Sequence, residues 1–243
     1  MKIFQYWDTG EPPEDVARMI ESFRVLNPGF KHRLFDRDAA SWYIRKRLDD
    51  RAQRAFDACR APAMQADVFR LAALWAEGGV YADADILCLV PIYMLIKKQA
   101  RPGLIVVYRN RIQNGFIVQK EPRDPFIGAC LELAIANIEA RRFSDVYTAT
   151  GPAIYNALWA LIAPEDSAGA PQDPYARDWD APEVLVHARE QVQVTPELVA
   201  SFRSMTLLHQ VGIDNWMVDG VPAYRQTSLH WYRWQGSIYH QAA

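Results

Sequence analysis

The chain has 243 residues, 50% of them hydrophobic and 12% aromatic, which supplies a sizeable core for one domain and excludes a disordered chain. Its 27 basic residues nearly balance its 29 acidic residues, so the charge disfavours nucleic acid as a partner. The three cysteines are scattered without CxxC spacing, which disfavours a disulfide framework or a zinc site and fits a reducing compartment.

Residues 1–60 predict two strands, each followed by helical sequence. Residues 1–6 are typical of a strand, and a helix is expected from Pro13, with acids in its first turn, to the Asn-Pro-Gly at residues 27–29. Residues 30–35 predict the second strand, followed by an arginine-rich helical region to about residue 60. Its basic side chains form either a solvated helix face or a contact for an anionic lipid head group or a nucleotide phosphate. They are Arg45, Lys46, Arg47, Arg51, Arg54 and Arg60.

The middle of the chain predicts a helix that passes directly into a strand. Residues 62–77 carry apolar side chains at helical spacing, namely Val68, Leu71, Ala72 and Trp75. Gly78 and Gly79 end this helix, because glycine adopts the left-handed conformation without steric cost. Residues 80–86 then predict a strand. This alternation indicates an α/β fold with a largely parallel, buried sheet.

The second half continues the pattern and ends in an aromatic tail. Strands are expected at residues 104–109 and 116–119, helices at 124–141 and 152–162, a surface loop at 164–182, and a folded tail at 214–239. The first residues have no signal-peptide core, and the longest apolar stretch is too short to span a membrane. We therefore expect a cytoplasmic protein, either fully soluble or resting on a membrane surface.

An Asp-x-Asp triplet carries the first chemical signal. If residues 80–86 form one strand, side chains alternate between its faces, so Tyr81, Asp83 and Asp85 share one face. Two carboxylates about 6–7 Å apart on a buried strand repel each other and call for a cation. Oxygen ligands favour Mg²⁺ or Mn²⁺. The other two such triplets, at residues 36–38 and 178–180, are interpreted as a turn and a loop.

A charged pair on the preceding helix adds context. Asp67 and Arg70 are three residues apart, so they are neighbours on one edge of the helix. The turn at Gly78 could return the chain so that this edge borders the same cleft as Asp83. An ordinary surface ion pair, worth less than about 1 kcal/mol, is the alternative, and with the triplet nearby the two interpretations are comparable.

Together these residues resemble a known family. The pattern Asp67-x-x-Arg70-x-x-x-Leu74-x-x-x-Gly78-Gly79-x-Tyr81-x-Asp83-x-Asp85 is similar to the signature of the DXD sugar transferases of glycosyltransferase family 32, which include the fungal initiating α-1,6-mannosyltransferases. It is also similar to the glucosylating domains of the large clostridial toxins. Looser similarity extends to residues 3–7, 114–116, 150–152 and the His-Trp at 230–231. In the tail, the Gly-Ser of the family is displaced and no Trp follows it.

The resemblance implies an α/β GT-A fold in a single domain, with a Rossmann-like mixed sheet flanked by helices, a nucleotide-binding half at about 1–120 and an acceptor-binding half at about 121–243. It implies that Asp67 and Arg70 hold the donor sugar, with Arg70 also near the diphosphate, and that these two form the catalytic set with Asp83 and Asp85. It implies that Asp85 binds Mn²⁺ or Mg²⁺ directly and that Asp83 contacts the ribose or the same metal. It further implies the following roles: Trp7 stacks on the nucleobase, Tyr81 lines the nucleotide pocket, Asn114 and Trp231 contact the donor, and His230 is a third metal ligand or a diphosphate contact.

The resulting prediction is a metal-dependent glycosyltransferase that moves a hexose from a UDP- or GDP-sugar to a glycan, glycolipid or protein, with retention of configuration. A bacterial-type enzyme of surface polysaccharide biosynthesis is expected, with the aromatic tail as a lid. Two alternatives remain. One is a non-catalytic carbohydrate- or nucleotide-binding module, because tryptophan and tyrosine can serve as sugar platforms. The other is a phosphatase with a strand-borne Asp-x-Asp, although Ile86-Leu87 follows the pair here.

Overall fold

A computed structural model describes residues 1–98, 101–108, 111–162, 182–209, 217–219, 222–226 and 237–240. The loop predicted from residue 164, the Asp-x-Asp at 178–180, and His230 and Trp231 lie outside these ranges. No helix in the described ranges is long and apolar enough to cross a membrane.

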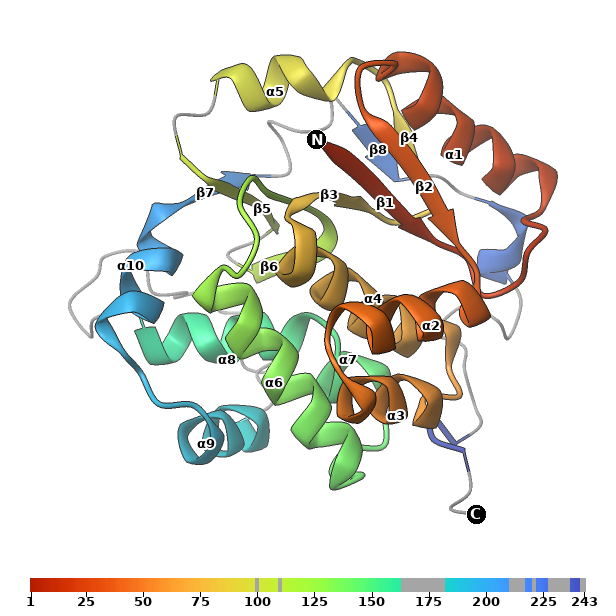
Figure 1. The fold of residues 1–243 in the computed structure, drawn as a ribbon. Helices are drawn as coiled ribbons and strands as arrows, with labels where there is room; N and C mark the ends of the chain where they lie inside the picture. The colour runs from red at the N-terminus through yellow and green to blue at the C-terminus, as the bar shows by residue number, and fades with distance from the viewer. Residues whose placement is uncertain are drawn as a thin grey trace.

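The described residues form an alternating series of helices and strands (Figure 1). The strands are β1 (Lys2–Tyr6), β2 (Lys31–Phe35), β3 (Gly79–Ala82), β4 (Ile86–Cys88), β5 (Gly103–Tyr108), β6 (Arg111–Gln119), β7 (Met205–His209) and β8 (Met217–Asp219). The helices are α1 (Glu14–Leu26), α2 (Arg37–Arg47), α3 (Asp50–Ala58), α4 (Pro62–Glu77), α5 (Ile92–Lys98), α6 (Pro125–Glu139), α7 (Val146–Ala149), α8 (Pro152–Ile162), α9 (Pro182–Gln191), α10 (Pro196–Ser204) and the 3-10 helix η2 (Ala223–Gln226).

Six strands form one mixed sheet in the order β2-β1-β3-β6-β5-β7. Strand β1 runs parallel to both β2 and β3, β5 runs parallel to β7, and β6 is antiparallel to its neighbours β3 and β5. Three of the five strand pairs are therefore parallel, as the alternation of helices and strands predicted, and β6 makes the sheet mixed. Because β2 and β3 lie on opposite sides of β1, the chain reverses its direction of progress across the sheet there, which opens a crevice beyond the carboxyl ends of β1 and β3.

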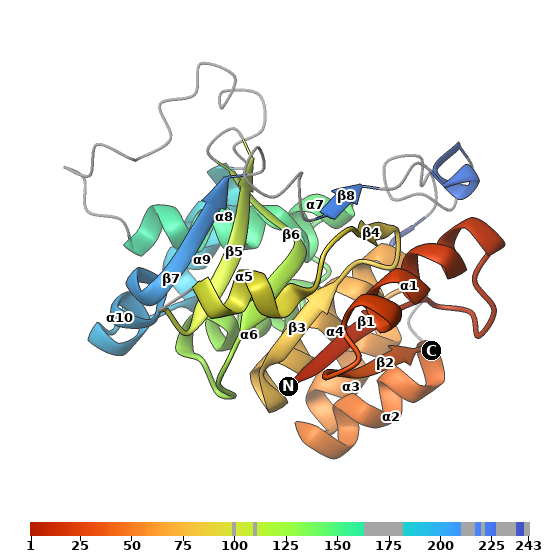
Figure 2. The same cartoon turned by 90° about the horizontal axis from the view of Figure 1, so that it is seen from above.

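The sheet is buried between two layers of helices (Figures 1 and 2). Phe4 and Tyr81 point from one face into a large core with α2, α3, α4, α6 and α8. Ile3 and Val80 point from the other face into a second core with α1, α5 and the two-stranded sheet of β4 and β8. The expected class, α/β with a mixed sheet flanked by helices, is confirmed.

The junction of α4 and β3 depends on two glycines. Gly78 and Gly79 have φ angles of 62° and 113°, a region that side chains with a Cβ rarely adopt. A Cβ on Gly78 would lie 2.9 Å from the carbonyl oxygen of Gln119, and one on Gly79 would lie 2.8 Å from that of Lys2. The helix can therefore end and the central strand can begin within two residues, as the sequence predicted.

Three predicted elements need correction. The strand predicted at residues 80–86 ends at Ala82, because a turn closed by the Ile86 N–H donating to the Asp83 carbonyl separates β3 from β4 (3.2 Å). The helical region before residue 60 is two helices, the second of which starts where Asp49 caps the Ala52 N–H at 2.8 Å. The strand predicted at 116–119 extends back to Arg111, since it pairs with β5 in a hairpin.

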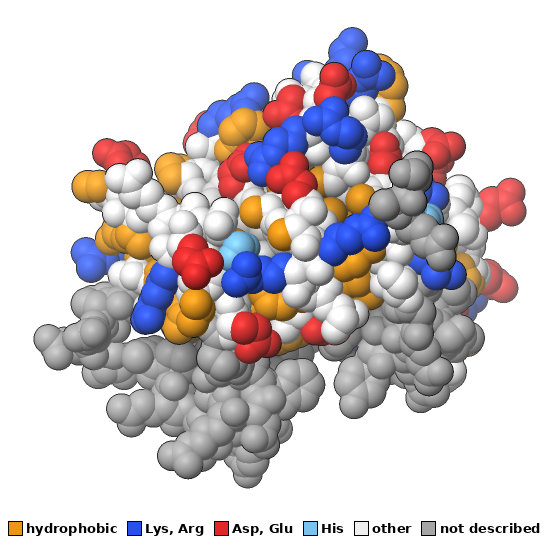
Figure 3. All heavy atoms as spheres, turned by 90° about the horizontal axis from the view of Figure 1, so that it is seen from below, with side chains coloured by type: hydrophobic (Ala, Val, Ile, Leu, Met, Phe, Trp, Pro, Cys, Tyr) orange, Lys and Arg blue, Asp and Glu red, His pale blue; other side chains and the backbone are white. Residues whose placement is uncertain are grey.

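The arginine-rich helices carry ion pairs on their solvent side. Basic and acidic side chains are interspersed on the lower face of the molecule (Figure 3). Arg45 pairs with Asp50 at 2.9 Å, and Arg51 pairs with Glu132 and Glu139 of α6 at 2.7 and 2.9 Å. These contacts favour the interpretation of this cluster as a solvated helix face. Asp36, whose triplet was interpreted as a turn, caps α2 by accepting from the Ala39 N–H at 2.8 Å.

Candidate active site

A cavity of about 590 Å³ lies at the carboxyl ends of β1 and β3. Its wall includes Trp7, which follows β1, and Asp83 and Asp85, which follow β3, together with residues of α4, β6 and η2. This is the crevice that the strand order creates, and ligands of open α/β sheets bind at such positions.

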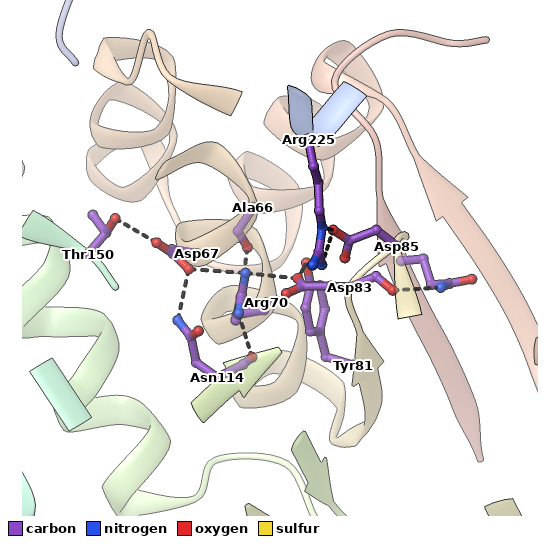
Figure 4. Close-up of polar contacts among 10 residues, drawn as sticks. Ala66, Asp67, Arg70, Tyr81, Asp83, Asp85, Asn114, Thr150 and Arg225 are labelled. Atoms are coloured by element: carbon purple, nitrogen blue, oxygen red, sulfur yellow. Dashed lines mark hydrogen bonds and ion pairs between the residues drawn. The ribbon is translucent and has the colours of Figure 1, made fainter. Parts of the chain in front are cut away.

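The predicted pair on α4 is buried and forms the centre of a polar network at this cavity (Figure 4). Asp67 and Arg70 are only 4% and 3% exposed, and their side chains are 3.0 Å apart. Asp67 also accepts hydrogen bonds from the Asn114 amide at 2.9 Å and the Thr150 hydroxyl at 3.0 Å. The alternative of a surface ion pair is therefore wrong, and the sequence spacing correctly placed both residues at the cleft.

Arg70 joins this network to the end of strand β3. Its guanidinium donates to Asp83 Oδ1 at 3.0 Å and to the backbone carbonyl of Asn114, and it lies 4.6 Å from the centre of the Tyr81 ring. The arginine thus fixes α4, β3 and β6 relative to one another. Because it is buried, each of its hydrogen bonds to a charged group contributes strongly to the stability of this arrangement.

Tyr81 supports the site from beneath. Its side chain is fully buried and its hydroxyl donates to Asp83 Oδ1 at 2.9 Å. Burial raises the pKa of Tyr81 well above its ordinary value, so the phenol remains a hydrogen-bond donor. The prediction that Tyr81 lines the pocket needs correction: it shares a face with Asp83, as expected, but lies behind that carboxylate and is absent from the described wall.

Asp83 and Asp85 line the cavity, but they do not lie within one strand as expected. Asp83 follows the last residue of β3, and its N–H donates to the Gly115 carbonyl at 2.7 Å. A Cβ on Gly115 would lie 2.9 Å from Asp83 Oδ2, so glycine leaves the space that this carboxylate fills. Asp85 lies in the turn before β4. Both residues line the cavity because the chain bends there, and the alternation along a single strand does not apply.

The carboxylates outnumber the cations in this network. The pKa of Asp83 is raised to about 7: burial is the largest cause, Arg70 acts in the opposite direction, and the neighbouring Asp85 and Asp67 add to the increase. Burial likewise raises the pKa of Asp67. Because burial and mutual repulsion disfavour the ionised form of these acids, a cation bound beside them would stabilise that form.

Arg225 contacts Asp85 from a distant part of the chain. Its guanidinium donates to Asp85 Oδ2 from Nε at 2.8 Å and from Nη2 at 2.5 Å. A cation therefore lies against the carboxylate that was predicted as a direct metal ligand, and the oxygen donors of Asp83 and Asp85 suit Mn²⁺ or Mg²⁺. The described residues contain no group of three His, Cys, Asp or Glu side chains placed to bind a metal. The predicted third ligand, His230, lies outside them.

Trp7 occupies the side of the cavity next to the acids. It is half-buried and packs against Ala84, the middle residue of the Asp-x-Asp triplet, together with Val16 and Ile20 of α1. Trp7 and Ala84 both line the cavity. The aromatic platform predicted for a nucleobase therefore adjoins the predicted metal ligands.

Sequence reasoning missed three contributors to the site. Arg225 carries no local motif, and it reaches Asp85 across 140 residues of sequence. Thr150 was noted only for its Thr-Gly-Pro context. Gln5 is fully buried in β1 and donates to the Asp83 carbonyl at 3.3 Å. A buried glutamine within an apolar strand was the one available signal for it, because such an amide needs partners.

Comparison with known proteins agrees with this geometry. Residues 13–102 match a family model described as a glycosyltransferase sugar-binding region containing the DXD motif. The matched region runs from α1 past the turn with Asp83 and Asp85 and includes all of α4.

Curated relatives match parts of the chain. The Saccharomyces cerevisiae protein HOC1, whose name marks it as a glycosyltransferase candidate, is 26% identical over 162 residues, or 59% of this chain and 41% of its own length. The initiation-specific α-1,6-mannosyltransferase of Schizosaccharomyces pombe is 27% identical over 101 residues, or 39% of this chain and 26% of its own length. The chain thus spans less than half the length of these relatives.

A solved structure named PaToxG glycosyltransferase covers 84% of this chain and 84% of its own, with 18% identity and a TM-score of 0.48. The family model and the curated relatives confirm the resemblance that the sequence predicted. Residues 13–102 of this chain are thus similar to the DXD-containing sugar-binding region of glycosyltransferases.

Proposed function

We propose that this chain is a glycosyltransferase that uses a divalent metal, Mn²⁺ or Mg²⁺, to bind a UDP- or GDP-sugar and transfers the hexose to a glycan, glycolipid or protein. The observation that carries the proposal is the buried network of Asp67, Arg70 and Asp83, which adjoins Asp85 at the wall of one large cavity. A binding module for plain sugars has no need for such a charged cluster.

The cavity offers separate surfaces for the parts of a nucleotide sugar. The ring of Trp7 can stack on a nucleobase, since aromatic side chains tolerate any base. Asp83 and Asp85 lie beside it through Ala84, where a metal bound to them would meet a diphosphate. Asp67 and Asn114 lie across the same cavity, and their polar groups can bind the hydroxyls of a sugar. The proposed division places nucleotide binding in residues 1–120 and acceptor binding in residues 121–243 of a single GT-A domain.

Transfer requires that the nucleotide leaves as an anion. A divalent cation held by Asp83 and Asp85 would act as a Lewis acid toward the diphosphate and stabilise that leaving group. Arg70 keeps Asp67 and Asp83 in fixed positions, because its guanidinium contacts both carboxylates at 3.0 Å. Preorganisation of this kind lowers the cost of reaching the transition state.

The same contacts bear on stereochemistry. Asp67 already accepts hydrogen bonds at both carboxylate oxygens, from Asn114 and Thr150. An oxygen engaged in this way is a poor covalent nucleophile. Given the retention that the resemblance implies, a double displacement through Asp67 is disfavoured, and we propose a front-face displacement in which no enzyme-bound sugar forms.

Calorimetric titration of UDP and GDP, each with Mn²⁺, with Mg²⁺ and with a chelator, tests the proposal. One nucleotide is expected to bind wild type only with metal and to raise its melting temperature, since a ligand at about 100 times its dissociation constant stabilises a fold by about 2.7 kcal/mol. Asp85→Asn is expected to abolish this binding. Asp38→Asn is the matched control, because Asp38 is the exposed second acid of another Asp-x-Asp triplet.

Turnover then distinguishes an enzyme from a binding module. With the nucleotide that binds, the corresponding nucleotide sugars are expected to release free nucleoside diphosphate slowly by hydrolysis and faster with an acceptor. If neither nucleotide binds wild type under any metal condition, the proposed function is wrong. If a nucleotide binds but no sugar donor is ever turned over, the chain is a nucleotide-binding module.

A further inference from the structure

The contact between Arg225 and Asp85 is the least expected feature of the cavity (Figure 4). Both Nε and Nη2 of the guanidinium donate to the same carboxylate oxygen, Oδ2, at 2.8 and 2.5 Å. The Asp85 side chain is 10% exposed and the Arg225 side chain is 27% exposed. The pair therefore lies at the border between the cavity and solvent, and it is accessible to an incoming ion.

Long-range structure places Arg225 there. Strand β8 pairs antiparallel with β4, which follows Asp85 directly, so Asp219 lies opposite Ile86. The N–H of Ala223 then donates to Asp15 Oδ2 in the first turn of α1 at 2.8 Å. These two attachments hold η2 near the Asp-x-Asp turn, where Arg225 contacts Asp85 and lines the cavity.

We propose that Arg225 is a donor-binding residue that exchanges partners: it neutralises Asp85 in the metal-free protein, and it moves to the donor diphosphate when a divalent cation takes Asp85. This inference rests on the proposed function. The guanidinium donates two hydrogen bonds to the carboxylate that would hold a cation, so the two would compete for Asp85. A diphosphate then offers the released guanidinium a planar pair of acceptor oxygens, which arginine binds in bidentate fashion.

The charges of the cavity favour this exchange. Among the described wall residues the only arginines or lysines are Arg70 and Arg225. Arg70 cannot take the same role, because it is 3% exposed and already bonds to Asp67, Asp83 and the Asn114 carbonyl. Of the two arginines in the described wall, the more exposed Arg225 is thus the one whose side chain can leave Asp85 and bind a diphosphate.

The first arm of the test measures Mn²⁺ alone, without nucleotide, through the electron paramagnetic resonance signal of free Mn²⁺. Arg225→Gln is expected to bind Mn²⁺ about tenfold more tightly than wild type, since one contact to a charged group no longer competes. Arg225→Lys, which keeps the charge but loses the planar fork, is expected to fall between them. Arg45→Gln, which removes an arginine paired with Asp50 outside the cavity, is the matched control and is expected to equal wild type.

The second arm measures nucleotides at saturating Mn²⁺. Wild type is expected to prefer the nucleoside diphosphate over the monophosphate, and Arg225→Gln is expected to reduce this preference about tenfold through weaker binding of the diphosphate. Arg45→Gln is again expected to match wild type.

The outcomes separate this inference from the proposed function. If wild type binds Mn²⁺ and nucleotide but Arg225→Gln and Arg225→Lys bind Mn²⁺ no more tightly, the exchange is wrong while the transferase proposal stands. If the preference for diphosphate is unchanged in both variants, Arg225 does not move to the donor, and the inference is likewise overturned. If wild type binds neither Mn²⁺ nor nucleotide, the proposed function itself fails.

Discussion

Two arginines contact the acids of one cavity, yet their surroundings differ sharply. Arg70 comes from the middle of α4, contacts Asp67 and Asp83 at 3.0 Å and is 3% exposed. Arg225 comes from the short helix η2, donates twice to one oxygen of Asp85, and its side chain is 27% exposed. The two arginines therefore differ in exposure: Arg70 is buried within its network, whereas Arg225 lies partly exposed beside a buried carboxylate.

The difference shows that burial changes how costly it is to break an arginine–carboxylate ion pair. A buried pair is costly to break, because the group left behind is an uncompensated charge. An exposed pair is worth little and is easily exchanged for water or another ion. The network around Arg70 is thus suited to hold the site's geometry, and the pair at Arg225 is suited to change during binding.

The largest effect on stability is expected when the network around Arg70 is broken. Arg70→Met should lower the free energy of unfolding by about 3–5 kcal/mol, because Asp67 and Asp83 lose their common partner inside the protein. Urea unfolding of wild type and variant measures this difference. Arg45→Met serves as the control and should change stability by less than about 1 kcal/mol. A loss below 1 kcal/mol for Arg70→Met would mean that the network is not the rigid part of the site.

An intermediate effect on the free energy of unfolding is expected when the pH is changed, because Asp83 then gains or loses a proton. Its pKa is raised to about 7, mainly by burial, so the folded protein keeps a proton there that the unfolded chain loses near pH 4. The contribution of this group to the free energy of unfolding is therefore full at low pH and is lost as the pH rises from about 4 to about 7.

Urea unfolding in the presence of a chelator between pH 4 and pH 8 measures this dependence. Asp83→Asn should remove it, so the difference in stability between wild type and variant should shift in favour of the variant as the pH rises. A shift in the opposite direction would mean that Arg70 outweighs burial at this carboxylate, and that the network is more tightly paired than its burial implies.

The smallest effect on stability is expected at the open pair. Arg225→Gln should lower the free energy of unfolding by about 1–1.5 kcal/mol, less than Arg70→Met, since Arg225 itself is partly exposed while its partner Asp85 is buried. Thermal and urea unfolding, in parallel with Arg70→Met, give the comparison directly. A loss as large as that of Arg70→Met would show that Arg225 is a structural residue and would remove the contrast between the two pairs.

Local sequence predicted the elements that local forces determine. The spacing of Asp67 and Arg70 on α4 and the glycines after it placed both charges near the acids that follow β3, because helix periodicity and glycine conformation act over a few residues. The strand through Asp85 was predicted wrongly. The Ile86 N–H donates to the Asp83 carbonyl at 3.2 Å and turns the chain there, and the alternation of apolar residues in 80–86 gave no sign of this turn.

The remaining parts of the site come from long-range packing. Thr150 meets Asp67 across 83 residues of sequence, and Arg225 meets Asp85 across 140. Their positions depend on how α7 and the β4–β8 pair pack against the rest of the protein, which the spacing of apolar residues does not predict. The roles predicted for His230 and Trp231 stay predictions, because both residues lie outside the described ranges.

The last described residues attach to the connection between α3 and α4. Tyr239 bridges to Cys59, the Arg60 N–H donates to the Ile238 carbonyl at 2.7 Å and the His240 N–H donates to the Ala58 carbonyl at 3.0 Å. Because α4 begins at Pro62 and carries Asp67 and Arg70, these contacts fix the backbone just before the helix that holds the polar network. The attachment joins residues far apart in the sequence, so the entropy of bringing them together is lost during folding and is not lost again when a ligand binds.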